Sequence, residues 1–103
     1  MTTPDLMPDD CASMEDIRRE IDRLDKSVIE TFALRYQYVL AAAPFKSSAT
    51  AVRAPERFAA MLAQRRTWAS DNGLNPDVIE KLFHDLVNHF IDEEMRHWQN
   101  SSN

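Results

Sequence analysis

Four charged side chains stand near apolar residues, where a partly buried ionic site could form. Arg18, Arg35 and Lys46 each adjoin an apolar residue, and Glu94 follows Ile91 by three positions. Arginine can bind a carboxylate through two parallel hydrogen bonds, and a lysine ammonium can stabilise negative charge that develops on an oxygen. The set therefore indicates a site for a small anionic substrate. Taken singly, each side chain also fits a solvent-exposed position or a surface ion pair.

The sequence offers little for other kinds of catalysis. No pair of nucleophile and base has a recognisable local signature. His89, Glu93 and His97 have helical spacing, but no cysteine or further histidine completes a zinc site. Gly73 is the only glycine, which excludes glycine-rich phosphate loops and most tight hairpins. We therefore expect no metal and no other cofactor.

Length and composition narrow the class of protein further. The 103 residues predict one domain, and 44% of them are hydrophobic, as in globular proteins. The net charge of −5 and the scattered cations argue against a nucleic-acid partner. No apolar run predicts a membrane span, and the first ten residues lack the features of a signal peptide. Cys11 has no second cysteine to pair with, so we expect a cytoplasmic protein without membrane association.

A long first helix is predicted over about 15–43. Ser13 and Asp16 form a pattern like a capping box at its start, and no glycine or proline interrupts it before Pro44. Its apolar stripe consists of Ile17, Ile21, Leu24, Val28, Phe32, Tyr36 and Val39. About 29 helical residues span roughly 43 Å, whereas a compact domain of about 100 residues has a radius of gyration of about 13 Å. We therefore expect the stripe to pack against a second copy of the chain. In an antiparallel pair, Arg18 of one copy can approach Arg35 of the other.

A loop and two further helices are predicted after the long helix. Small and polar residues over 44–54 predict the loop. Pro55 and Gly73 mark the ends of a short helix, and Pro76 begins a helix of medium length that continues to Trp98, expected in the core or at an interface. The predicted fold is all-α, with three helices in the order long, short, medium. The predicted boundaries are a flexible tail 1–12, a helical domain 13–99 and a C-terminal tail 100–103.

The order of these segments resembles the all-helical chorismate mutase family. The resemblance covers about 14–98 and rests on DIRREIDRLDKSVIETFALRYQYV, FK, APERFAAML and NGLNPDVIEKLFHDLVNHFIDEEM, in that order. Within the family, the chain is most similar to the isochorismate pyruvate lyase branch. There, a tail with a cysteine, the FK segment, the APER stretch and an aromatic-rich last helix occur together.

The resemblance implies an intertwined homodimer with two equivalent sites. Each site would take the catalytic residues Arg35, Lys46 and Glu94 from one chain, and Arg18 from the partner chain would bind substrate. Arg57 matches a further cation that mutases use for substrate binding. The apolar walls of the site would be Val39, Ala42, Met61 and Ile91. The implied substrate is a small dicarboxylate, isochorismate or chorismate.

Three positions depart from the family pattern. Glu94 stands where bacterial members usually have glutamine, and a glutamate can donate a hydrogen bond only when protonated. Phe58 replaces the glutamate with which mutases contact the ring hydroxyl, which favours a lyase. Pro44 replaces the usual arginine or glycine and would shift the hinge of the loop.

The implied reaction is elimination of pyruvate from isochorismate to give salicylate. It would be pericyclic and free of cofactors, with weak chorismate mutase activity beside it. A dedicated chorismate mutase and a catalytically inactive helical dimer of the same fold are the alternatives.

Overall fold

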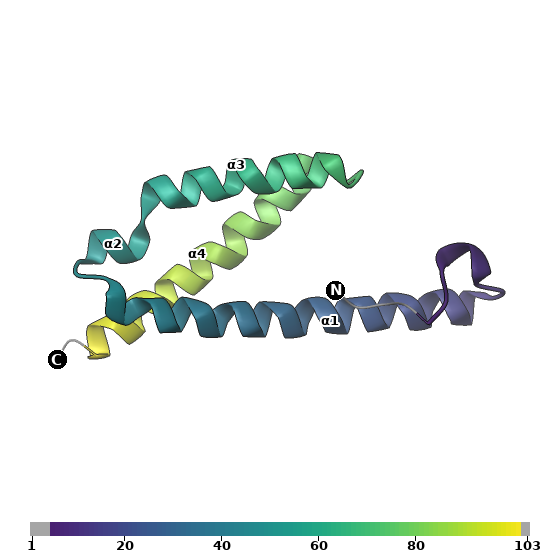
Figure 1. Ribbon diagram of the computed structural model, residues 1–103, viewed down its shortest axis with the longest axis horizontal. Helices are drawn as coiled ribbons and strands as arrows, with labels where there is room; N and C mark the ends of the chain where they lie inside the picture. Colours follow the sequence, from purple (N-terminus) through teal and green to yellow (C-terminus); the bar gives the residue numbers. More distant parts are fainter. Residues whose placement is uncertain (1–4, 102–103) are drawn as a thin grey trace. The chain divides into compact units, whose positions relative to one another are not determined.

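All regular elements of the chain are helical within residues 5–101, the range that the computed structural model describes. Their order is η1 (Pro8–Asp10), α1 (Met14–Ala42), η2 (Ala43–Phe45), α2 (Ala49–Arg53), α3 (Pro55–Asp71) and α4 (Pro76–Ser101), as Figure 1 shows. Helices α1, α3 and α4 contain 29, 17 and 26 residues, which confirms the predicted order long, short, medium. None of the helices in this range has both the length and the apolarity to cross a bilayer.

Helix α1 begins at the predicted cap. The Ser13 Oγ accepts a hydrogen bond from the Asp16 N–H at 3.1 Å, and the Asp16 Oδ2 accepts one from the Ala12 N–H at 2.9 Å. These bonds satisfy amides that would otherwise lack partners at a helix start. The helix ends at Ala42, because Pro44 disfavours α-helical geometry at the residue before it.

The chain divides into two compact units, residues 1–37 and 38–103. In the first unit, η1 forms within the tail predicted over 1–12, and Asp5 of this tail pairs with Arg23 at 3.3 Å, while the flexibility of the tail stays a prediction. Residues 1–4 lie outside the described range. Three residues of the predicted apolar stripe of α1 remain about half exposed: Ile21 (50%), Leu24 (47%) and Val28 (48%).

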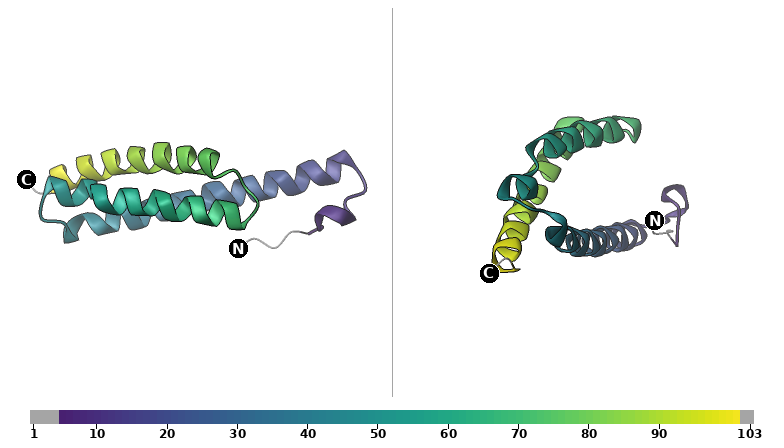
Figure 2. Two further views of the ribbon diagram at one scale, coloured as in Figure 1. Left: turned by 90° about the horizontal axis from the view of Figure 1, so that it is seen from above. Right: turned by 60° about the vertical axis from the view of Figure 1, so that its left-hand side comes forward.

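The core of the second unit lies between α3 and α4, which run antiparallel and side by side (Figures 1 and 2). It consists of the buried residues Met61, Leu62 and Val87, with Phe58, Phe83 and Ile91 packed against them. The turn between the two helices follows the prediction. Gly73 adopts a positive φ of 74°, a conformation that costs other residues free energy, and Asn75 caps α4 by accepting from the Asp77 N–H at 2.9 Å.

The prediction of a loop over 44–54 is wrong in part, because α2 lies within it. Ser48 caps this helix by accepting a hydrogen bond from the Ala51 N–H at 3.1 Å. Val52 is only 1% exposed, and α2 packs against α4. A helix of five residues is too short to show an amphipathic pattern in the sequence and is marginal by itself, so we attribute its stability to packing, above all to the burial of Val52. Helix α4 also continues to Ser101, beyond the predicted domain end at 99, and residues 102–103 lie outside the described range.

Candidate active site

Lys46 is the residue around which the candidate site is built. It follows η2 with an extended backbone, at φ −105° and ψ 133°. Its N–H donates to the Ala43 carbonyl at 3.1 Å, and its carbonyl accepts from the Trp98 Nε1 at 2.9 Å. Its Nζ donates to the Glu94 Oε2 at 2.7 Å. The backbone and the ammonium of Lys46 are therefore both held in place.

The Lys46–Glu94 contact is a short ion pair at the edge of the interior. Glu94 is 2% exposed, whereas the Lys46 side chain is 25% exposed. A buried carboxylate is costly unless it is paired, and Lys46 supplies that pairing. The sequence alone also allowed a solvent-exposed position for Glu94, and its burial in the structure excludes that position. An ammonium has three N–H donors, so Lys46 keeps capacity for a ligand while bound to Glu94.

The predicted apolar walls lie in the second unit with this pair. Met61 is buried in the α3–α4 core, and Ile91 packs against the same cluster one turn before Glu94. Val39 and Ala42 are half-buried in the last turns of α1. Among these four residues, the structure therefore joins Met61 and Ile91 in one apolar cluster, and the part of all four as walls of a substrate site stays a prediction.

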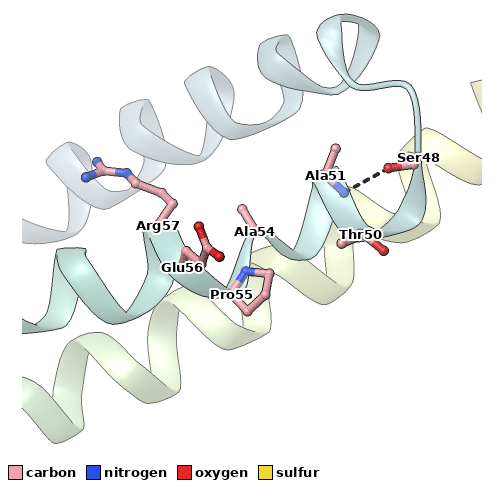
Figure 3. Close-up of a pocket in the computed structure, with 7 residues that line it drawn as sticks. All are labelled: Ser48, Thr50, Ala51, Ala54, Pro55, Glu56 and Arg57. Carbon is pink, nitrogen blue, oxygen red and sulfur yellow. Dashed lines mark hydrogen bonds between the residues drawn. The ribbon is translucent and has the colours of Figure 1, made fainter.

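Arg57 lies elsewhere in the second unit, on the first turn of α3. Its side chain is exposed and lines an open pocket at the junction of α2 and α3 (Figure 3). The other residues of this pocket are Ser48, Thr50, Ala51, Ala54, Pro55 and Glu56. Lys46 and Glu94 do not line it, so the role of Arg57 in substrate binding stays a prediction.

Arg18 and Arg35 both belong to the first unit. Arg18 is exposed near the start of α1, and Arg35 is half-buried seventeen residues further along the helix. Helical geometry separates two such positions by roughly 25 Å along the axis. One helix therefore cannot bring both side chains to a single small ligand, and their shared role stays a prediction that involves a second chain.

The histidines of α4 make contacts other than metal ligation. His89 lies 4.0 Å from Glu93, which also binds Arg96, and His84 contacts Asp85 at 3.2 Å. Among the residues that the structure describes, no three His, Cys, Asp or Glu side chains gather as a ligand set.

One residue that contacts the site is Trp98, for which the sequence predicts only a place in the core or at an interface. It lies four positions after Glu94, so both side chains leave α4 on the same face. The spacing was visible in the sequence. Its partner was not, because the bond is made to a backbone carbonyl 52 residues away.

The fold and the family comparison agree on the class of protein. The chain belongs to the chorismate mutase type II family, whose model matches residues 17–95. This match includes α1 from Ile17 onward, the Lys46 segment, α3 and α4 as far as Met95.

Individual relatives narrow the comparison. The chain is 42% identical over 92 residues to a protein of Pseudomonas aeruginosa named isochorismate pyruvate lyase, covering 89% of this chain and 91% of that protein. It is 37% identical over 82 residues to the T-protein of Haemophilus influenzae, covering 79% of this chain but 21% of the relative. The T-protein of Enterobacter agglomerans is also 37% identical, over 70 residues that cover 67% of this chain and 19% of the relative.

Proposed function

We propose that this protein is an isochorismate pyruvate lyase, which eliminates pyruvate from isochorismate and yields salicylate. The observation that carries the proposal is the reciprocal match with the Pseudomonas aeruginosa protein of that name, which covers about nine tenths of both chains. The T-proteins, in contrast, are matched over only about a fifth of their length. A cytoplasmic location belongs to the same proposal, because the lone Cys11 suits a reducing compartment.

The proposed reaction needs positioning and charge stabilisation. The bond between the ring carbon and the ether oxygen breaks while a ring hydrogen moves to the methylene carbon of the enolpyruvyl group. The ether oxygen becomes the carbonyl oxygen of pyruvate and the ring becomes aromatic, so the atoms balance within the substrate. No covalent bond to the protein and no cofactor is required. Holding a reactive conformer can lower the barrier by several kcal/mol, with about 7–11 kcal/mol as a ceiling.

Lys46 is the residue that we assign to the breaking bond. Its partly exposed ammonium has free donor capacity and is fixed by the buried Glu94. Placed beside the ether oxygen, it would stabilise the negative charge that develops there by on the order of 3 kcal/mol. Glu94 would orient the ammonium and limit its approach.

The carboxylates of the substrate are assigned to arginines. Arg35 would bind one of them, and Arg18 of a second copy would bind the other, which makes a homodimer part of the proposal. The half-exposed Ile21, Leu24 and Val28 support this assembly, because a continuous apolar stripe on a long helix is usually buried against another surface.

The position of Phe58 supports a lyase over a dedicated chorismate mutase. Its side chain packs against the α3–α4 core and makes an edge-to-face contact with His84, at 5.4 Å between ring centres. An apolar side chain used in the core offers no acceptor for a ring hydroxyl. The partly exposed ammonium of Lys46, which keeps donor capacity for a ligand while bound to Glu94, supports an active protein over an inactive helical dimer.

An assay with two substrates tests the proposal. The purified protein is mixed with isochorismate while salicylate fluorescence is followed, and separately with chorismate while prephenate is measured. We expect rapid formation of salicylate and slow formation of prephenate. Faster conversion of chorismate would favour the mutase, and no product from either substrate would favour the inactive dimer.

A further inference from the structure

We infer that Trp98 is a positioning residue for Lys46, an inference that rests on the proposed function. Its indole N–H donates to the Lys46 carbonyl at 2.9 Å, and an indole nitrogen can act only as a donor. Trp98 is half-buried, so the bond is partly shielded from water. The contact is made to the backbone of the residue whose ammonium would act on the substrate.

Two side chains of helix α4 contact Lys46, one at its ammonium and one at its backbone. Glu94 binds the ammonium, and Trp98, one helical turn later, binds the backbone carbonyl. Side chains spaced by four residues on one helix thus hold both the backbone and the tip of the side chain of Lys46. A lysine side chain has four rotatable bonds along its carbon chain, so the ion pair alone could form from several positions of the backbone. The second contact removes that freedom.

The segment around Lys46 depends on such contacts because it has little regular structure of its own. Lys46 and Ser47 lie outside regular secondary structure between η2 and α2, and the backbone of Lys46 is extended. A helix would supply a donor for the Lys46 carbonyl, but here the indole N–H supplies it. The flanking residues Ala43 and Val52 are each 1% exposed, and they fix the two ends of the segment. Trp98 fixes its middle.

A small displacement of Lys46 is expected to matter for the proposed reaction. Misplacing a catalytic group by about 1 Å can reduce a rate by 100-fold. Loss of the Trp98 bond would allow the carbonyl to turn toward water and the ammonium to follow. A purely structural tryptophan would instead weaken the fold, and its loss would affect turnover whether or not Lys46 were present.

A double-mutant cycle separates the two roles. Trp98→Phe keeps an aromatic ring but removes the donor, and we expect it to lower kcat for isochorismate about fivefold to tenfold with little change in KM. Trp68→Phe is the matched control, because Trp68 is half exposed on α3 and stacks on Arg65. It should change kcat by less than about twofold. In a Lys46→Ala background, Trp98→Phe should have no further effect on kcat.

Hydrogen exchange tests the same bond without any substrate. The amides of residues 43–53 should exchange faster in Trp98→Phe than in the wild type, and Trp68→Phe should leave them unchanged. If Trp98→Phe does not fold, benzothienylalanine at position 98 keeps the size and shape of the indole without its N–H, and the same results are expected.

Two results would overturn the inference: an unchanged kcat in Trp98→Phe, or an equal loss of kcat with and without Lys46. A wild-type protein that converts neither substrate would instead overturn the proposed function. The exchange experiment would then still decide whether Trp98 holds the segment, since faster exchange supports that role and unchanged exchange contradicts it.

Discussion

The ammonium of Lys46 lies 2.7 Å from a carboxylate oxygen of Glu94, which is almost completely buried. Lys46 lies near the start of the second unit in the sequence and Glu94 lies near its end, 48 positions later. Each residue stabilises the other in this position. The lysine cation compensates for the desolvation of the carboxylate, and the carboxylate holds the flexible lysine side chain in place.

Lys46→Ala should reduce turnover of isochorismate by at least about 100-fold, as loss of one charge-stabilising donor typically does. It should also destabilise the fold by about 1–3 kcal/mol, because Glu94 stays buried without its partner. Steady-state kinetics and urea unfolding measure the two effects. Adding Glu94→Gln should restore part of the stability but none of the turnover. Near-normal turnover in Lys46→Ala would show that this ammonium does not face the substrate.

Glu94→Gln should lower kcat for isochorismate by about tenfold while the protein stays folded. A glutamine can still accept a hydrogen bond from the Lys46 ammonium, but it lacks the negative charge that holds this cation in the wild type. The ammonium would then be positioned less firmly for the proposed reaction. Asp92→Asn is the matched control, because Asp92 pairs with Arg53 at a more exposed position of the same helix, and it should leave kcat nearly unchanged. Steady-state kinetics measures both variants, and an unchanged kcat in Glu94→Gln would show that this carboxylate does not position Lys46.

Val28→Glu should dissociate the proposed homodimer. Val28 is half exposed in the single chain and lies in the middle of the apolar stripe of α1, so a carboxylate there would be buried in the interface at a cost of several kcal/mol. Lys26→Glu introduces the same side chain two positions earlier, off the stripe, and should leave the dimer intact. Sedimentation at micromolar concentration distinguishes the two outcomes. A wild-type protein that sediments as a folded monomer would refute the dimer itself.

Ala54→Gly should stabilise the fold by about 1 kcal/mol. Ala54 joins α2 to α3 with φ 41° and ψ 61°, a left-handed conformation that costs an L-residue roughly 1–2 kcal/mol. Glycine removes most of that strain but raises the entropy of the unfolded chain. Gly73→Ala is the reciprocal control: an added Cβ meets no atom within 4 Å, so its conformational strain alone should destabilise. Urea midpoints that move in the same direction for both variants would contradict this account.

Local signals explain what the sequence could predict. The start of α1 follows from Ser13 and Asp16, three residues apart, and the turn before α4 follows from Gly73 and Asn75. Each of these features is decided by a few neighbouring residues, so its signature is present in a short stretch of sequence.

Features that depend on distant contacts were harder to predict. The sequence does not predict helix α2, because five residues carry no helical pattern and the buried Val52 packs against distant residues. Spacing could not join Lys46 to Glu94, and only the resemblance to a family placed the two in one site. Neither spacing nor the family resemblance predicts the bond from Trp98 to the Lys46 carbonyl, because every residue has a backbone carbonyl and the residue type does not show which one accepts.

The place of Trp98 near the end of α4 separates the residues that fold the second unit from a residue that supports Lys46. The α3–α4 core lies around Val87 and Ile91, and Ile91 precedes Trp98 by seven residues, which is about two helical turns. A chain cut just before Trp98 would therefore keep this core and lose the donor to the Lys46 carbonyl. We expect such a truncation to reduce activity more than it lowers the melting temperature, so an intact melting curve would not certify an active preparation.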